Sequence, residues 1–195
     1  MSANDWMAGG TALFLATLDG VDDRHLAQPT ALPGWTGKHV VAHVHYNAVA
    51  LCRLVRWAAT GVENRMYESA EQRGREIEHA ATLPATELRA LVRESADDLA
   101  NALGTLSAQT WANEVVTAQG RTVPASEIPW LRAREVYVHA VDLGGATSFE
   151  DVPEDVLAAL LTDVVSRRCK AGEGASLAGW LTGRVTSSPP LGAWL

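Results

Sequence analysis

The residues of this chain that are best suited to chemistry include a glutamate and a histidine one helical turn apart. Glu135 and His139 are four positions apart, and residues at that spacing share one face of an α-helix. The same face would also carry Arg132 and Asp142, with Ile128 at one end. Apolar residues flank this row, so burying its ionisable groups is costly unless they pair with one another or bind a metal ion.

A second polar row is expected on an earlier helix, and its members are Thr36, His39, His43 and Asn47. Two polar rows on otherwise apolar helices satisfy one another when they face each other across a helical bundle. We therefore expect His43 to meet Glu135 and His139. Two imidazoles and one carboxylate form a ligand set of catalytic zinc sites, in which one position stays open for water or substrate.

A plainer interpretation stays open, because a glutamate followed four positions later by a histidine commonly lies on a solvated helix face. His39, at the start of its helix, is expected to face solvent, and support of a metal ligand is the alternative for it. His45 is rotated about 160° from His43 on a helical wheel and is not expected to bind the ion. Cys52 has apolar neighbours that would not lower its pKa, so a nucleophilic role is not expected.

The elements that must position these residues are helices. Caps, prolines, glycines and apolar periodicity predict helices over 4–20, 36–61, a short stretch around Arg73 and Ile77, a segment that starts at Pro84, 125–143, and a segment from Pro153 to Cys169. A loop is expected over 21–35, and irregular or briefly extended chain over 107–124. The predicted fold class is all-α, a four-helix bundle over 1–150 followed by a short C-terminal segment over 151–195.

The composition argues against some classes of function and indicates a cellular compartment. The net charge of −7 and the pI near 5.3 argue against nucleic-acid binding, which depends on basic side chains. No apolar run approaches the roughly 20 residues that span a bilayer. The first residues carry no basic leader and the chain has two separated cysteines, so we expect a cytoplasmic protein with reduced thiols. The expected partners are small molecules, and the oligomeric state stays open, with a homodimer as one expectation.

Several motifs resemble the mycothiol-dependent maleylpyruvate isomerase family, a branch of the DinB-like metal-binding bundles. They are LPGWTGKHVVAHVHYNAVAL (32–51), MYESAEQRGREIEHAA (66–81), ESADDLANAL (94–103), WxRxREVYVHAVDLG (130–144), LAGWLTGR (177–184) and PPLGAWL (189–195). The resemblance implies that His43, Glu135 and His139 hold a divalent metal, typically zinc. It also implies that Arg73 binds the substrate.

The resemblance further implies that mycothiol, a low-molecular-weight thiol, is the cosubstrate. Its thiolate would add to the activated double bond of an electrophile such as maleylpyruvate, and its expulsion after bond rotation would give the trans isomer. Arg73 would clamp a substrate carboxylate, and Asp142 or Arg132 would support the metal ligands. Family members carry a C-terminal α/β domain, of which this chain is expected to keep only a shortened part.

Three alternatives stay open. The first is a thiol S-transferase that acts on another electrophile and releases the thiol adduct as its product, and the second is a bundle that binds a metal or a partner without catalysis. The third is a non-haem iron enzyme, since two histidines and one carboxylate also suit Fe(II).

Overall fold

The computed structural model describes residues 1–191, and the described chain is mainly helical, as predicted. It divides into two compact units, Met1–Asp151 and a second that begins at Val152. The first unit is a four-helix bundle, and it holds every residue singled out for chemistry above. No helix among the described residues is long and apolar enough to cross a membrane.

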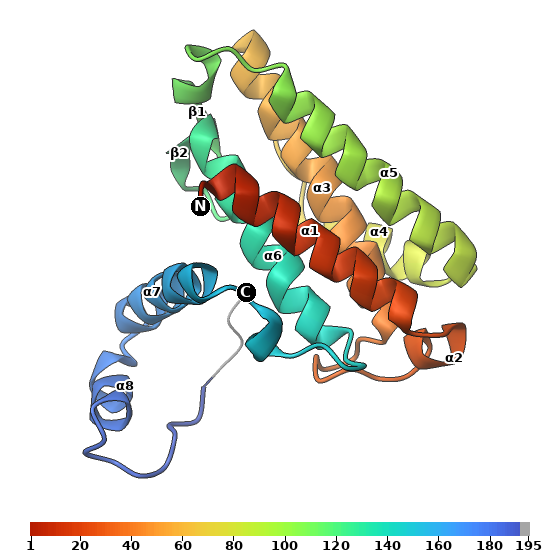
Figure 1. The fold of residues 1–195 in the computed structure, drawn as a ribbon. Coiled ribbons are helices and arrows are strands. Elements are labelled where there is room, and N and C mark those ends of the chain that lie inside the picture. Colours follow the sequence, from red (N-terminus) through yellow and green to blue (C-terminus); the bar gives the residue numbers. More distant parts are fainter. Residues whose placement is uncertain (192–195) are drawn as a thin grey trace. The chain divides into compact units, whose positions relative to one another are not determined.

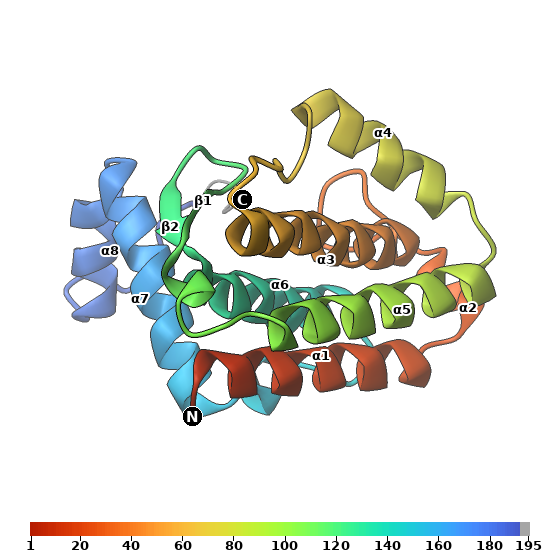
Figure 2. The same cartoon turned by 90° about the horizontal axis from the view of Figure 1, so that it is seen from above.

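Four long helices form the bundle (Figure 1): α1 (Ala3–Gly20), α3 (Gly37–Thr60), α5 (Ala85–Gly104) and α6 (Ile128–Asp142). The first unit also contains α2 (Asp23–Leu26), α4 (Ala70–Ala81) and an antiparallel hairpin of β1 (Glu114–Val116) and β2 (Thr122–Pro124). In this arrangement α1 packs against α6, and α3 packs against α4, α5 and α6. Seen from above, α4 lies along α3 outside the four-helix bundle (Figure 2).

The start and end of α3 follow from its sequence. Thr36 precedes the helix in an extended conformation as the N-cap, and Gly61 ends it with a φ of 72°, a left-handed conformation that glycine adopts without strain. On its inner face, Val40, Leu51 and Leu54 are completely buried. The predicted helix over 36–61 is confirmed, so His43 stands in the second turn of a well-anchored helix.

The end of α6 was also predicted. A single 3₁₀ turn over Ala125–Glu127 leads into the helix, which ends before Gly144 and Gly145, with φ values of 75° and 72°. The short stretch of extended chain expected over 107–124 is the β1–β2 hairpin, whose turn contains Gly120 at a φ of 75°.

Two short helices were not predicted. Within the expected loop over 21–35, the side chain of Asp22 accepts a hydrogen bond from the backbone N–H of His25 at 2.7 Å and caps the single turn of α2. The second unit contains α7 (Glu154–Lys170), as predicted, and also α8 (Gly174–Leu181). The small residues at the start of α8 gave no apolar periodicity that would indicate a helix. The last four residues of the PPLGAWL motif lie outside the described residues.

Close packing of α1 on α6 depends on Gly10. A Cβ atom at this position would lie 2.6 Å from Cγ2 of Val136 and 2.8 Å from the ring of Tyr137. Because a β-branched side chain has little rotational freedom, the two helices would have to separate. We expect Gly10→Ala to lower the free energy of unfolding by about 1–3 kcal/mol, measured by urea titration.

Gly74 offers a matched control because it lies inside α4 with nothing within 4 Å of an added Cβ. Alanine is favoured over glycine there by up to about 1 kcal/mol, so Gly74→Ala should stabilise the protein. Equal shifts for the two variants would contradict the packing account of Gly10.

Candidate metal centre

The two polar rows face one another across the contact between α3 and α6. Arg132 on α6 donates to the side-chain oxygen of Asn47 on α3 at 2.9 Å. One turn further along α6, Glu135 pairs with His43, which lies one turn back along α3. Later residues of α6 thus pair with earlier residues of α3, as expected for antiparallel helices. This arrangement brings two groups from α6 and one from α3 to a single point.

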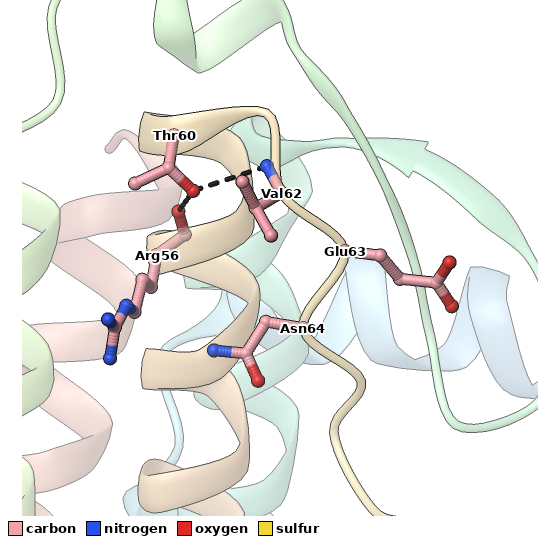
Figure 3. Close-up of a pocket in the computed structure, with 5 residues that line it drawn as sticks. All are labelled: Arg56, Thr60, Val62, Glu63 and Asn64. Carbon is pink, nitrogen blue, oxygen red and sulfur yellow. Dashed lines mark hydrogen bonds between the residues drawn. The ribbon is translucent and has the colours of Figure 1, made fainter.

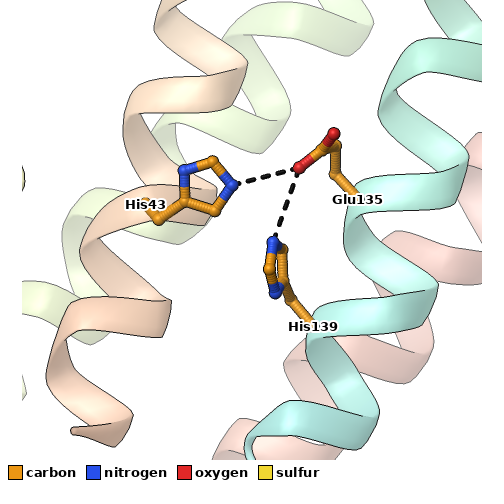
Figure 4. Close-up of side chains that lie close together, drawn as sticks. All are labelled: His43, Glu135 and His139. Atoms are coloured by element: carbon orange, nitrogen blue, oxygen red, sulfur yellow. Dashed lines mark hydrogen bonds and ion pairs between the residues drawn. The ribbon is translucent and has the colours of Figure 1, made fainter. Parts of the chain in front are cut away.

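His43, Glu135 and His139 meet at that point (Figure 4), and their ligand atoms all lie within 4.8 Å of one another. Oε2 of Glu135 is 3.0 Å from Nε2 of His43 and 3.5 Å from Nε2 of His139. Ligands about 2.0–2.2 Å from a tetrahedral zinc ion are separated by about 3.3–3.6 Å. The two distances from Glu135 lie close to this range, and the donor atoms are of the type that binds a divalent ion.

The three side chains are removed from solvent, with 4% of His43, 6% of Glu135 and 8% of His139 exposed. Burial lowers the pKa of His43 to about 4. Burial would raise the pKa of Glu135, but hydrogen bonds from the two histidines hold it well below its usual range. Burial would lower the pKa of His139, yet its hydrogen bonds to Asp142 and Glu135 raise it to about 9.

These pKa shifts indicate the protonation states of the three side chains in the metal-free protein near neutral pH. Glu135 is a carboxylate, His139 is a protonated imidazolium that donates to Glu135 and Asp142, and His43 is a neutral imidazole. Since Nε2 of His43 donates to Glu135, its Nδ1 accepts a hydrogen bond. The donor to Nδ1 is Nη2 of Arg73, at 3.1 Å.

Two further charged side chains contact residues of the cluster on the side away from the shared carboxylate oxygen. Nδ1 of His139 is 2.8 Å from Oδ2 of Asp142, so the carboxylate orients the ring and directs Nε2 toward the cluster. Oε1 of Glu135, the oxygen not shared with the histidines, is 3.7 Å from Nε of the buried Arg134. Sequence reasoning selected Asp142 but missed Arg134, which is adjacent to Glu135 in the sequence and carried no spacing signal of its own.

The structure brings Arg73 to the cluster and places Arg132 one turn away from it. Arg132 is 1% exposed, and its guanidinium donates to the carbonyl oxygen of Val44 at 2.7 Å as well as to Asn47. Burial lowers the pKa of Arg132 to about 10, so it stays charged near neutral pH. Its hydrogen bonds therefore connect α6 to α3, whereas Asp142 contacts a cluster residue directly.

The expectation that His39 faces solvent is wrong. Its side chain is 16% exposed, Nδ1 accepts from the backbone N–H of Thr36 at 3.2 Å, and its ring stacks on Trp35 with centroids 6.3 Å apart. The ring of Trp35 is also 5.5 Å from the ring of His43. The contacts of Trp35 with the two histidines were not predicted, because Trp35 precedes the helix and does not share its periodicity.

His45 and Cys52 lie on other faces of α3. Nδ1 of His45 is 3.0 Å from the carbonyl oxygen of Leu91 on α5, and His45 does not belong to the metal-ligating cluster found among the described residues. Burial raises the pKa of Cys52 to about 11, which disfavours a thiolate there.

A shallow pocket of about 300 Å³ lies near the other end of α3 (Figure 3). Arg56, Thr60, Val62, Glu63 and Asn64 line it, and the Thr60 hydroxyl connects the carbonyl oxygen of Arg56 to the N–H of Val62. From His43 to Thr60 the helix rises about 25 Å, so this pocket is separate from the metal cluster.

We expect Asp142→Asn to weaken divalent metal binding about 10- to 100-fold, because it removes the carboxylate that orients His139. Competition with a chromophoric chelator would measure the dissociation constant. Asp97→Asn on the exposed surface of α5 removes the same charge and serves as the control. Equal affinities of the two variants would show that Asp142 does not support the site.

Comparisons with known proteins agree with this geometry. The family model for the mycothiol maleylpyruvate isomerase N-terminal domain matches residues 7–144. No curated protein matches significantly. A solved mycothiol-dependent maleylpyruvate isomerase is 44% identical over 84% of this chain and 68% of its own, with a TM-score of 0.82. A histidine-to-alanine mutant of the mycothiol-dependent isomerase gives the same identity and coverage, with a TM-score of 0.81.

YfiT from Bacillus subtilis, a four-helix bundle of unusual topology, shares the fold alone. It is 18% identical over 72% of this chain and 83% of its own, with a TM-score of 0.60. The long match to the family model and the 44% identity to a solved isomerase show membership of a family as well as a shared fold. The chain belongs to the mycothiol maleylpyruvate isomerase family.

Proposed function

We propose that this protein is a zinc-dependent enzyme that uses mycothiol to convert a cis unsaturated acid such as maleylpyruvate into its trans isomer. The observation that carries the proposal is the buried cluster of His43, Glu135 and His139 in a chain 44% identical to a mycothiol-dependent maleylpyruvate isomerase. His43, Glu135 and His139 would hold the ion, and Asp142 would orient His139. When bound, a divalent ion lowers the pKa of a coordinating thiol and so supplies a thiolate near neutral pH.

Arg73 is the residue that we assign to a substrate carboxylate. In the metal-free protein its guanidinium donates to Nδ1 of His43. A histidine that binds a metal through Nε2 carries its proton on Nδ1, so both groups would then be donors and their contact would be lost. Loading the site thus releases a guanidinium beside the ligands, and a guanidinium pairs with a carboxylate through two parallel hydrogen bonds.

The proposed reaction needs no net transfer of protons or electrons. The thiolate sulfur forms a bond to one alkene carbon, and the π electron pair moves onto the conjugated carbonyl oxygen as an enolate. The former double bond is now single and rotates. The electron pair then returns, the carbon–sulfur bond breaks, and the thiolate leaves. Burial of the cluster favours this sequence because it keeps water away from the developing charges.

The proposal can be tested by measuring the turnover of maleylpyruvate by absorbance. Metal-depleted and zinc-restored protein would each be assayed with and without mycothiol. We expect turnover only when both zinc and the thiol are present. Turnover without thiol, or equal turnover in metal-depleted protein, would contradict the proposal. A thioether that accumulates as a stable product would instead identify a thiol S-transferase on the same site.

A further inference from the structure

Tyr67 lies beside the metal centre although no part of the proposed mechanism uses it. It belongs to the segment between α3 and α4, and the guanidinium of Arg73 sits over its ring, 5.7 Å from the centroid. Through Arg73, Tyr67 is one side chain away from His43. The negative charge of Glu135 contributes to raising the pKa of the Tyr67 hydroxyl, after burial as the main cause. The side chain is partly buried, so the ring borders the site rather than open solvent.

The phenol proton of Tyr67 is available for donation. A guanidinium can only donate, so any hydrogen bond between Arg73 and this hydroxyl runs from Arg73 to the phenol oxygen. The phenol oxygen is therefore the acceptor in that pair, and its own proton is left for another partner. Burial raises the pKa of Tyr67, an effect that the nearby guanidiniums of Arg73 and Arg53 oppose without reversing. The group is accordingly a neutral phenol near neutral pH, polarised by an adjacent positive charge.

We infer that Tyr67 is a further catalytic residue, whose hydroxyl donates a hydrogen bond to the carbonyl oxygen of the electrophile as that oxygen becomes an enolate. The inference rests on the proposed function. Arg73 would hold a carboxylate of the substrate, and the adjacent Tyr67 hydroxyl would meet the oxygen that receives the π electron pair when the carbon–sulfur bond forms. No proton is transferred, because the hydrogen bond weakens again as the pair returns and the thiolate leaves. A donor placed where charge develops stabilises the transition state more than the ground state.

Tyr67→Phe tests this role because it keeps the ring beneath Arg73 and removes only the hydroxyl. We expect kcat for maleylpyruvate with mycothiol to fall about 100-fold, with zinc content unchanged and KM changed little. Tyr46→Phe is the matched control, since Tyr46 is a partly buried tyrosine of α3 whose ring packs against His45 and the core. It should keep the wild-type kcat. A kcat for Tyr67→Phe within twofold of wild type would overturn the inference and leave Tyr67 as a support for Arg73.

A second measurement separates this inference from the proposed function. Oxalate offers one carboxylate to Arg73 and a neighbouring anionic oxygen to the Tyr67 hydroxyl, and it does not react, so its binding to the zinc-loaded protein can be titrated calorimetrically. We expect Tyr67→Phe to bind oxalate about tenfold more weakly than wild type and Tyr46→Phe do. If wild type turns over no unsaturated acid, the proposed function fails, and the oxalate comparison still decides whether Tyr67 is a donor. Equal affinities of wild type and Tyr67→Phe would overturn the donor role.

Discussion

Replacing His139 or His43 by alanine is expected to weaken zinc binding about 10²- to 10³-fold. A structural zinc site is stabilised by about 10–16 kcal/mol, so each of four ligands contributes about 2.5–4 kcal/mol. Nε2 of each ring lies against the same carboxylate oxygen, and both rings are buried. Removing either ring therefore removes one ligand from the site. Equilibrium dialysis against a metal buffer would measure the dissociation constant.

His45→Ala is the control for this experiment. His45 is on the same helix as His43, but its ring contacts the carbonyl oxygen of Leu91 on α5. It should keep wild-type zinc affinity while losing one hydrogen bond of the fold. The assignment of the metal centre is wrong if both the His43 and His139 variants retain full zinc occupancy under the same conditions.

Zinc affinity is expected to rise about 100-fold between pH 6 and pH 8. The pKa of His139 is raised to about 9, above the usual histidine value of about 6.5, so the metal-free protein carries this proton throughout that range. Binding must remove it, so the affinity increases about tenfold for each unit of pH. His43, with a pKa of about 4, is already neutral above pH 6 and adds no further dependence.

Calorimetry in two buffers of different ionisation enthalpy would count the protons released at pH 7, and we expect about one. Asp142→Asn removes a hydrogen bond that raises the pKa of His139, so its affinity should depend less steeply on pH between 7 and 8. A zinc affinity that does not change with pH in the wild-type protein would show that the metal-free site does not hold this proton.

Much of this site could be predicted from the sequence because it is built on two long helices. The period of an α-helix places Glu135 and His139 on one face whatever the rest of the chain does. Polar rows that would be costly to bury alone identify the faces that must meet, and the Asn47–Arg132 and His43–Glu135 pairs show that they do.

The rest of the site depends on contacts that periodicity does not encode. Arg73 reaches His43 because α4 packs along α3, and that contact joins residues 30 positions apart. Without the resemblance to a known family, no spacing rule would have selected Arg73. Tyr67 and Trp35 border the site from segments outside the helices, where the backbone follows local turns. His39 was misplaced because its capping contact with Thr36 and its stacking on Trp35 outweigh solvation of the imidazole.

We propose that His43, Glu135 and His139 hold a zinc ion to which an added thiol can bind. X-ray absorption at the zinc K-edge, recorded on the zinc-loaded protein with and without mycothiol, tests that claim most directly. Without the thiol we expect nitrogen and oxygen ligands alone, at about 2.0–2.2 Å, and with it one additional sulfur at about 2.3 Å. A sulfur ligand present before mycothiol is added would place a protein cysteine on the ion, and no sulfur after its addition would remove the thiol from the metal centre; either result would contradict the account.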